Sequence, residues 1–173
     1  MREKPGVLIS EKQIRTKVKE LGKLITADYQ GKELLVIGIL KGSVVFLSDL
    51  IREIELPVKI DFMAVTSYGA ATRTSGVVRI LKDLDSDIGG QDVLIVEDII
   101  DTGLTLSYLK ENLQKRNPAS LKVCTFLDKP SRRKIEIKAD YNGYDIPDRF
   151  VVGYGLDCNE KYRNLPYIGL YNE

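Results

Sequence analysis

The chain has 173 residues, which is enough for one domain with a hydrophobic core and too few for two full domains. Its 26 basic and 25 acidic side chains leave a formal charge of +1, so a polyanion such as nucleic acid is not expected as the main partner. The sequence contains no histidine, which excludes Ser-His-Asp and Cys-His catalysis and the usual zinc sites. A base that works near neutral pH must therefore be a carboxylate or a lysine, and a metal must be a hard cation bound by oxygen.

We interpret residues 1–173 as a single domain. The amino terminus lacks the apolar core of a signal peptide, and the longest apolar run, residues 34–40, is far shorter than a membrane span. We therefore expect a cytoplasmic protein without a membrane partner. Cys124 alternates with apolar residues and is predicted to be buried in a strand, and neither it nor Cys158 has metal-ligand spacing.

The first part of the chain is predicted to contain a helix, a strand and a second helix. A capping box at residues 10–13 opens an amphipathic helix over about residues 11–29. Residues 34–40 are typical of a strand buried on both faces of a parallel sheet, and residues 41–43 turn into the second helix. The inner side of that helix is expected to consist of Val44, Val45, Leu47, Leu50 and Ile51.

The rest of the chain continues this alternation. Residues 58–65 form a third apolar segment, residues 93–115 a second strand-and-helix unit, and residues 121–127 and 150–152 further strands. Strands that alternate with helices predict an α/β domain with a mostly parallel twisted sheet flanked by helices.

Two segments do not fit this sheet. Residues 66–76 are small, polar and bounded by glycine, so we expect a mobile excursion that acts as a lid, with ordinary disorder as the alternative. Residues 129–138 carry five basic side chains and one acid. A solvated rim explains most of them, and we expect chemistry from Lys129, with Arg133 as a second candidate.

Residues 93–106 are the most informative part of the sequence. Four branched aliphatic residues at 93–96 indicate a buried parallel strand, and open α/β sheets bind ligands at the carboxyl ends of such strands. Glu97 and Asp98 follow at that end. Residues 101–105 then open a helix, whose free N–H groups form an anion site.

Acids beside an anion site repel a bare phosphate, so the ligand should carry hydroxyl donors or a cation next to its phosphate. A phosphorylated ribose bound with a divalent metal meets this demand. The alternative interpretation is a strand that ends in solvated acids, with Asp101 or Thr102 as an ordinary helix N-cap.

The segment 93–106 resembles the phosphoribosyl pyrophosphate signature of the type I phosphoribosyltransferases, and its Glu-Asp-Ile-Ile-Asp-Thr-Gly version is similar to that of the hypoxanthine-guanine phosphoribosyltransferases. Residues 40–43 resemble the pyrophosphate loop of that family, and residues 67–69 its flexible closing loop. Lys129 resembles its purine-reading lysine, and residues 150–157 its base-stacking and metal segment. Leu104 stands where relatives from higher organisms often carry lysine, which is similar to the bacterial subgroup.

The resemblance implies an α/β fold with a small hood built from the terminal segments. It also implies transfer of 5-phosphoribose from phosphoribosyl pyrophosphate to hypoxanthine or guanine, Mg²⁺ as cofactor, and a homodimer or homotetramer.

The resemblance assigns roles residue by residue. Asp101 is implied as the general base for the purine proton, and neighbouring carboxylates should help it to hold that proton. The residues implied to bind phosphoribosyl pyrophosphate and the nucleotide are Lys41, Gly42, Glu97, Asp98, Ile99, Ile100, Thr102, Gly103, Leu104, Thr105 and Arg163. Those implied to bind the purine are Lys129, Phe150, Val151 and Asp157. The metal is implied at Asp157, Glu97 and Asp98, and the flexible loop at Ser67 and Tyr68.

The implied purine site predicts discrimination against adenine. Lys129 would donate to the oxygen at C6 of a 6-oxopurine, whereas the amino group of adenine offers no acceptor there.

Two alternatives stay open at this point. One is a nucleotide-sensing regulator on the same fold that contacts RNA through residues 129–138. The other is a transferase for a different base, such as a pyrimidine or xanthine. Xanthine shares the C6 oxygen, and no decisive side chain for C2 is visible in the sequence.

Overall fold

The computed structural model describes residues 5–67 and 78–171, whose main feature is a six-stranded sheet in the order β4-β3-β2-β5-β6-β7. The strands are β2 (Leu34–Leu40), β3 (Val58–Ser67), β4 (Val78–Lys82), β5 (Asp92–Ile100), β6 (Ser120–Asp128) and β7 (Tyr141–Asp145). All neighbouring pairs are parallel except β3 and β4. The predicted mostly parallel α/β fold is therefore confirmed.

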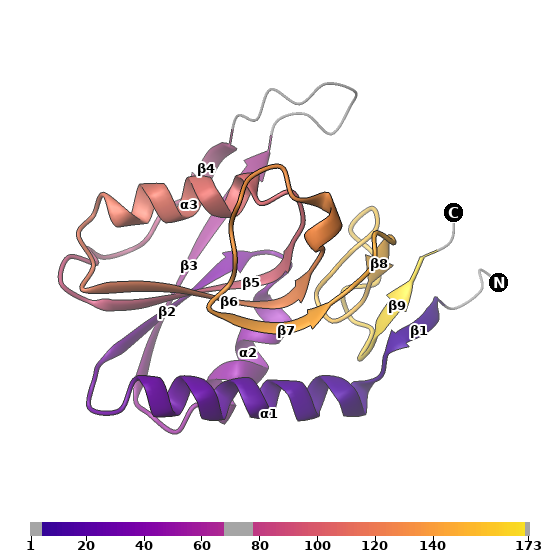
Figure 1. The fold of residues 1–173 in the computed structure, drawn as a ribbon, viewed down its shortest axis with the longest axis horizontal. Coiled ribbons are helices and arrows are strands. Elements are labelled where there is room, and N and C mark those ends of the chain that lie inside the picture. Colours follow the sequence, from indigo (N-terminus) through magenta and orange to yellow (C-terminus); the bar gives the residue numbers. More distant parts are fainter. Residues whose placement is uncertain (1–4, 68–77, 172–173) are drawn as a thin grey trace.

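Helices cover both faces of this sheet (Figure 1). The helices α1 (Glu11–Asp28) and α2 (Val44–Glu53) share one apolar cluster with the sheet, and α3 (Leu104–Gln114) packs on the opposite face with a second cluster. Because both faces are covered, β2 and the first part of β5 are apolar runs rather than alternating strands.

The terminal segments form the predicted hood, a three-stranded sheet in the order β1-β9-β8. Its strands are β1 (Gly6–Ile9), β8 (Val151–Val152) and β9 (Ile168–Leu170). This sheet lies beyond the ends of β6 and β7, where the strand arrows point (Figure 1).

The boundaries of α1 follow the sequence prediction, and the capping box is present in both directions. The inner side of α2 differs from the prediction, because Val44 is 41% exposed while Phe46 is fully buried. Val44 is the first helical residue and faces outward, whereas Phe46 and Leu47, later in the same turn, are buried.

Two boundaries near the predicted ligand site also differ. β5 runs on to Ile100, so Glu97 and Asp98 lie within the strand rather than after it. Residues 66 and 67 belong to β3 and pair with β4, so the proposed excursion does not begin at residue 66. Tyr68 and the rest of that segment, residues 68–76, lie outside the described residues. Within the described ranges, no helix is both long and apolar enough to cross a membrane.

Candidate active site

A cavity of about 460 Å³ opens at the carboxyl ends of β2, β3 and β5, beside the first turn of α3. This edge of the sheet is where parallel α/β folds place ligands. Twelve of the residues singled out in the sequence line it: Lys41, Gly42, Glu97, Asp98, Ile99, Ile100, Asp101, Thr102, Gly103, Thr105, Asp157 and Arg163.

Glu97 and Asp98 are enclosed acids. Glu97 is only 7% exposed. Loss of solvation, reinforced by the charge of Asp98, raises the pKa of Glu97 well above its ordinary value. Burial likewise raises the pKa of Asp98 to about 6, although the N–H of Ile99 donates to this carboxylate over 2.8 Å and the charge of Arg163 opposes the shift. The cavity thus concentrates negative charge that favours a cation or hydroxyl donors.

The turn between β5 and α3 forms the second wall of the cavity. Gly103 has φ +84° directly before the helix, a left-handed conformation that glycine adopts without a side-chain penalty. A Cβ on Gly103 would also lie 2.6 Å from the Ile137 side chain. The N-cap residue of α3 is Gly103. The alternative interpretation, in which Asp101 or Thr102 is the N-cap, is therefore wrong. The first helical turn presents N–H groups that suit an anion.

Asp101 lines the same cavity as the carboxylates of Glu97, Asp98 and Asp157, but its own hydrogen-bond partner is a cation. Its Oδ1 accepts a hydrogen bond of 2.7 Å from Nε of Arg132, and the two side chains are 43% and 44% exposed. Arg132 ends a short 3₁₀ helix, Pro130–Arg132, that leads the chain from β6 back over the turn. The sequence pattern assigns this arginine to a solvated rim. Nothing in the local sequence distinguishes Arg132 from its basic neighbours.

Arg133, the second candidate of that segment, contacts the main chain. Its guanidinium donates to the carbonyl oxygens of Ile100 and Asp101 over 3.2 and 2.6 Å. It also forms an ion pair with the buried carboxylate of Asp128. Its contacts therefore brace the turn rather than face the cavity.

The segment that carries Asp157 and Arg163 has an unusual backbone. Six residues between 153 and 162 have positive φ, namely Gly153, Tyr154, Gly155, Asn159, Glu160 and Tyr162. Backbone of this kind persists only where the surroundings hold it, and it is concentrated at functional sites. Here Arg163 donates to the Gly155 carbonyl over 2.8 Å and pairs with Asp157 at 2.9 Å.

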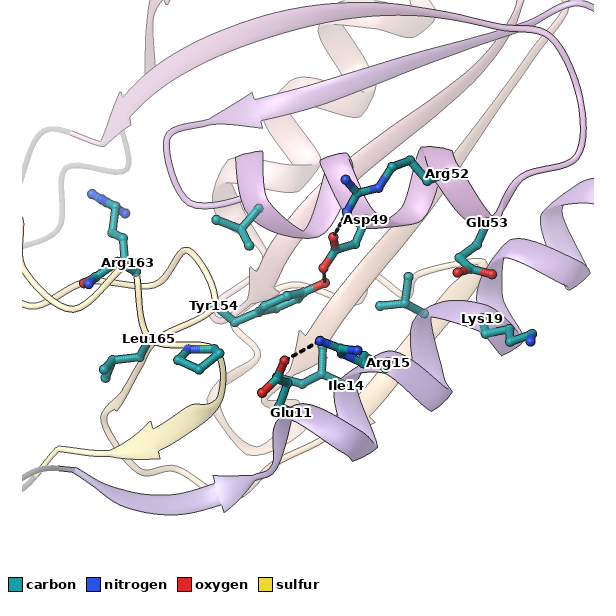
Figure 2. Close-up of a pocket in the computed structure, with 14 residues that line it drawn as sticks. Glu11, Ile14, Arg15, Lys19, Asp49, Arg52, Glu53, Tyr154, Arg163 and Leu165 are labelled. Atoms are coloured by element: carbon teal, nitrogen blue, oxygen red, sulfur yellow. Dashed lines mark hydrogen bonds and ion pairs between the residues drawn. The ribbon is translucent and has the colours of Figure 1, made fainter.

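Tyr154 anchors the same segment from behind. Its ring packs against Phe46 and Phe126, and its hydroxyl donates to Asp49 of α2 over 2.8 Å (Figure 2). A second cavity of about 690 Å³ lies here between α1, α2 and residues 163–166. Arg163 lines both cavities, and its side chain points away from the two helices (Figure 2).

Lys41 has a partner that the sequence analysis missed. Its ammonium forms an ion pair of 3.0 Å with Glu160, and both side chains are about two-thirds exposed (68% and 65%). The hydrogen bond with Lys41 holds the pKa of Glu160 below its ordinary value.

Four of the other predicted residues, Leu104, Lys129, Phe150 and Val151, do not line the 460 Å³ cavity. Leu104 begins α3, while Lys129 is 8% exposed and its N–H donates to the Ile100 carbonyl over 3.0 Å. Phe150 is 54% exposed and makes an edge contact with Tyr171, so it is not a core aromatic. Val151 is buried in β8. Ser67 ends β3.

Within residues 5–67 and 78–171, no group of three or more acidic or cysteine side chains could hold a metal ion by itself.

Comparisons of the sequence and of the structure with known proteins indicate the same family. The phosphoribosyl transferase domain matches residues 9–159. The chain is 57% identical over 164 residues to a protein from Bacillus subtilis named hypoxanthine-guanine phosphoribosyltransferase, covering 95% of this chain and 91% of that one.

Solved structures agree with this match. A hypoxanthine phosphoribosyltransferase from Staphylococcus aureus superposes with a TM-score of 0.93 at 54% identity, covering 99% of this chain and 92% of that one. A hypoxanthine-guanine phosphoribosyltransferase from Bacillus anthracis superposes with a TM-score of 0.94 at 54% identity, covering 98% and 100%. The chain therefore belongs to the phosphoribosyltransferase family, in the group of the hypoxanthine-guanine phosphoribosyltransferases.

Proposed function

We propose that this protein transfers the 5-phosphoribosyl group of phosphoribosyl pyrophosphate to N9 of hypoxanthine or guanine, giving IMP or GMP and pyrophosphate. One observation carries the proposal. Two enclosed acids with raised pKa values, Glu97 and Asp98, lie in one cavity with the glycine turn at a helix amino terminus. A ligand that combines hydroxyl groups with a phosphate can interact with both, because its hydroxyls donate to the acids and its phosphate accepts from the N–H groups of the helix amino terminus.

The donor binds across these two walls. Residues 101–105 hold the 5′-phosphate through the N–H groups of the first helical turn and the hydroxyls of Thr102 and Thr105. Glu97 and Asp98 accept hydrogen bonds from the ribose hydroxyls. Their negative charge also stabilises the positive charge that develops at the ribosyl centre as the bond to pyrophosphate breaks.

Cations stabilise the leaving group. Lys41 and Arg163 line the cavity and are paired here with Glu160 and Asp157, so they must exchange carboxylate partners for pyrophosphate oxygens when the donor binds. No three acids of the described residues form a metal site by themselves, so Mg²⁺ would be bound jointly by the acids of the cavity, which offer hard oxygen ligands, and by oxygens of the donor. Asp157, Glu97 and Asp98 would hold the ion, directly or through waters, and once bound it supplies positive charge for the departing pyrophosphate.

Asp101 acts as the general base and accepts the proton that the purine loses. Its half-exposed carboxylate lines the cavity next to the phosphate turn, within reach of a base placed between that turn and Lys129.

Lys129, Phe150 and Val151 select the purine. Phe150 is exposed enough to stack on the ring, the Val151 main chain pairs with its edge, and Lys129 donates to the oxygen at C6. Ser67 and Tyr68 close the site against water.

We also propose that the protein is a single domain, that it is cytoplasmic, and that it forms a homodimer or homotetramer. Neither alternative from the sequence gains support, because the relatives described above are named for hypoxanthine and guanine.

A base panel tests the proposal. Purified protein with phosphoribosyl pyrophosphate and Mg²⁺ is given hypoxanthine, guanine, xanthine or adenine, and pyrophosphate release is followed. We expect turnover with the first two and almost none with adenine. Preference for xanthine or adenine would overturn the substrate assignment. Salt-dependent RNA binding without pyrophosphate release would favour the regulator.

A further inference from the structure

The segment that follows β6 is bound closely to the turn that carries Asp101. The N–H of Lys129 donates to the Ile100 carbonyl over 3.0 Å, and the N–H of Lys134 donates to the Thr102 carbonyl over 2.9 Å. Between them, Arg133 donates to the carbonyl of Asp101 itself over 2.6 Å. The main chain on both sides of Asp101 is therefore held by residues 129–134.

These contacts fix the Asp101 backbone and leave the rotation of its side chain free. Within the described residues, the Asp101 carboxylate has one hydrogen bond, the bond of 2.7 Å from Nε of Arg132. The Arg132 guanidinium is itself steadied by a second acid, because its terminal nitrogen lies 3.6 Å from the Asp148 carboxylate. The charge of Asp101 raises the pKa of Arg132, as expected for a close ion pair.

The position of Arg132 in the chain connects this contact to the purine. Lys129 precedes the 3₁₀ helix that Arg132 ends, and the N–H of Arg132 donates to the Lys129 carbonyl over 3.0 Å. The oxygen at C6 and the nitrogen N7 are neighbouring groups on one edge of a 6-oxopurine. Lys129, which is proposed to bind the oxygen at C6, and Arg132, which contacts the carboxylate proposed to accept the proton at N7, therefore lie only three residues apart in one short segment.

We propose that Arg132 is a positioning residue for the reaction: its guanidinium holds the carboxylate of Asp101 in the orientation that accepts the purine proton. The proposal rests on the proposed role of Asp101 as base. A carboxylate that rotates freely spends only part of its time in a productive orientation, so loss of this contact lowers the rate of chemistry without weakening donor binding.

Single-turnover kinetics separate chemistry from product release and give the test. Arg132→Ala should lower the single-turnover rate about tenfold, while the dissociation constant of phosphoribosyl pyrophosphate stays within about twofold of wild type. Arg132→Lys, which keeps a cationic donor, should recover most of the rate. Because both side chains are more than two-fifths exposed, the ion pair contributes little to stability and the variants should fold.

A matched control is Arg15→Ala on α1, which removes another exposed arginine–carboxylate pair on the helix that packs on the opposite face of the sheet from α3. Its single-turnover rate should equal that of wild type. Equal losses in Arg15→Ala and Arg132→Ala would show a general effect of lost surface charge and overturn the proposal.

A double-mutant cycle with Asp101→Asn decides whether Arg132 acts through Asp101. Adding Arg132→Ala to Asp101→Asn should cause no further loss of rate. The proposal would be overturned if Arg132→Ala lowered the rate of Asp101→Asn by the same factor of about ten that is expected in the wild-type background, or if Arg132→Ala alone had a normal rate. Either result would leave the proposed function intact. A normal rate in Asp101→Asn alone would overturn both the base assignment and this proposal. Absence of transfer by wild-type protein would contradict the proposed function itself.

Discussion

Gly42 and Asp98 are in such close contact that a Cβ on residue 42 would overlap the carboxylate of Asp98. The two residues come from different strand ends, and they meet because β2 and β5 pair in parallel with Gly38 opposite Val96. The turn after β2 and the acids of β5 therefore form one surface. The absence of a side chain at residue 42 is a requirement of the site.

Gly42→Ala should displace the Asp98 carboxylate from the cavity. We expect the affinity for phosphoribosyl pyrophosphate to fall at least about tenfold, because the ribose hydroxyls lose a charged acceptor. The measurement is a binding titration, with circular dichroism to verify the fold. Gly6→Ala is the matched control, because a Cβ there meets nothing within 4 Å. Wild-type affinity in Gly42→Ala would mean that Asp98 does not contact the donor.

Glu97→Gln should stabilise the ligand-free protein at neutral pH. A folded-state pKa raised above the unfolded value means that the folded state holds a proton which the unfolded state releases. Stability is therefore lost as pH rises from about 4 towards the raised pKa, and the penalty persists above it. Asp98, with its pKa raised to about 6, contributes in the same direction.

Thermal unfolding at pH 4 and pH 8 measures this effect. Glu97→Gln should unfold at a higher temperature than wild type at pH 8 and at about the same temperature at pH 4, while losing affinity for the donor. Glu136→Gln, at an exposed acid, is the control and should show neither change. A lower unfolding temperature of Glu97→Gln at pH 8 would contradict an uncompensated charge at this position.

Lys129→Gln should relax the choice of base. An amide can accept as well as donate, so the amino group of adenine would no longer face a donor alone. We expect kcat/KM for hypoxanthine to fall roughly 10- to 100-fold and the ratio of hypoxanthine to adenine activity to narrow. Lys134→Gln, at an exposed lysine of the same segment, is the control. Unchanged discrimination in Lys129→Gln would remove Lys129 from the purine site.

Arg133→Met should destabilise the protein strongly. The Arg133 and Asp128 side chains are only 16% and 10% exposed, so the change leaves an enclosed carboxylate without its cation. Unfolding free energy should fall by about 3–5 kcal/mol in a denaturant titration. Arg52→Met removes an exposed arginine from its pair with Asp49 and should cost less than about 1 kcal/mol. A similar small loss in both variants would contradict the bracing role of Arg133.

The parts of the fold that could be predicted are those whose signal is local. The capping box at Ser10 and the apolar runs of β2 and β5 depend on neighbouring residues, and each gave the element at nearly its true position. The acids and glycine of residues 97–103 likewise form a contiguous motif, and the structure gathers them in one cavity.

The remaining features depend on contacts between distant segments. β7 has the sequence Tyr-Asn-Gly-Tyr-Asp, which carries little strand propensity, and it pairs only at the edge of the sheet. Arg132 meets Asp101 across 31 positions because a 3₁₀ helix returns the chain over the turn. The hydrophobic periodicity of the sequence does not indicate that these two segments are in contact.

Binding of phosphoribosyl pyrophosphate with Mg²⁺, measured by equilibrium dialysis, tests the central claim most directly. The protein should bind the donor, and Glu97→Gln and Asp98→Asn should each bind it at least about tenfold more weakly while remaining folded. Failure of the folded wild-type protein to bind the donor, or equal binding by both variants, would contradict the account.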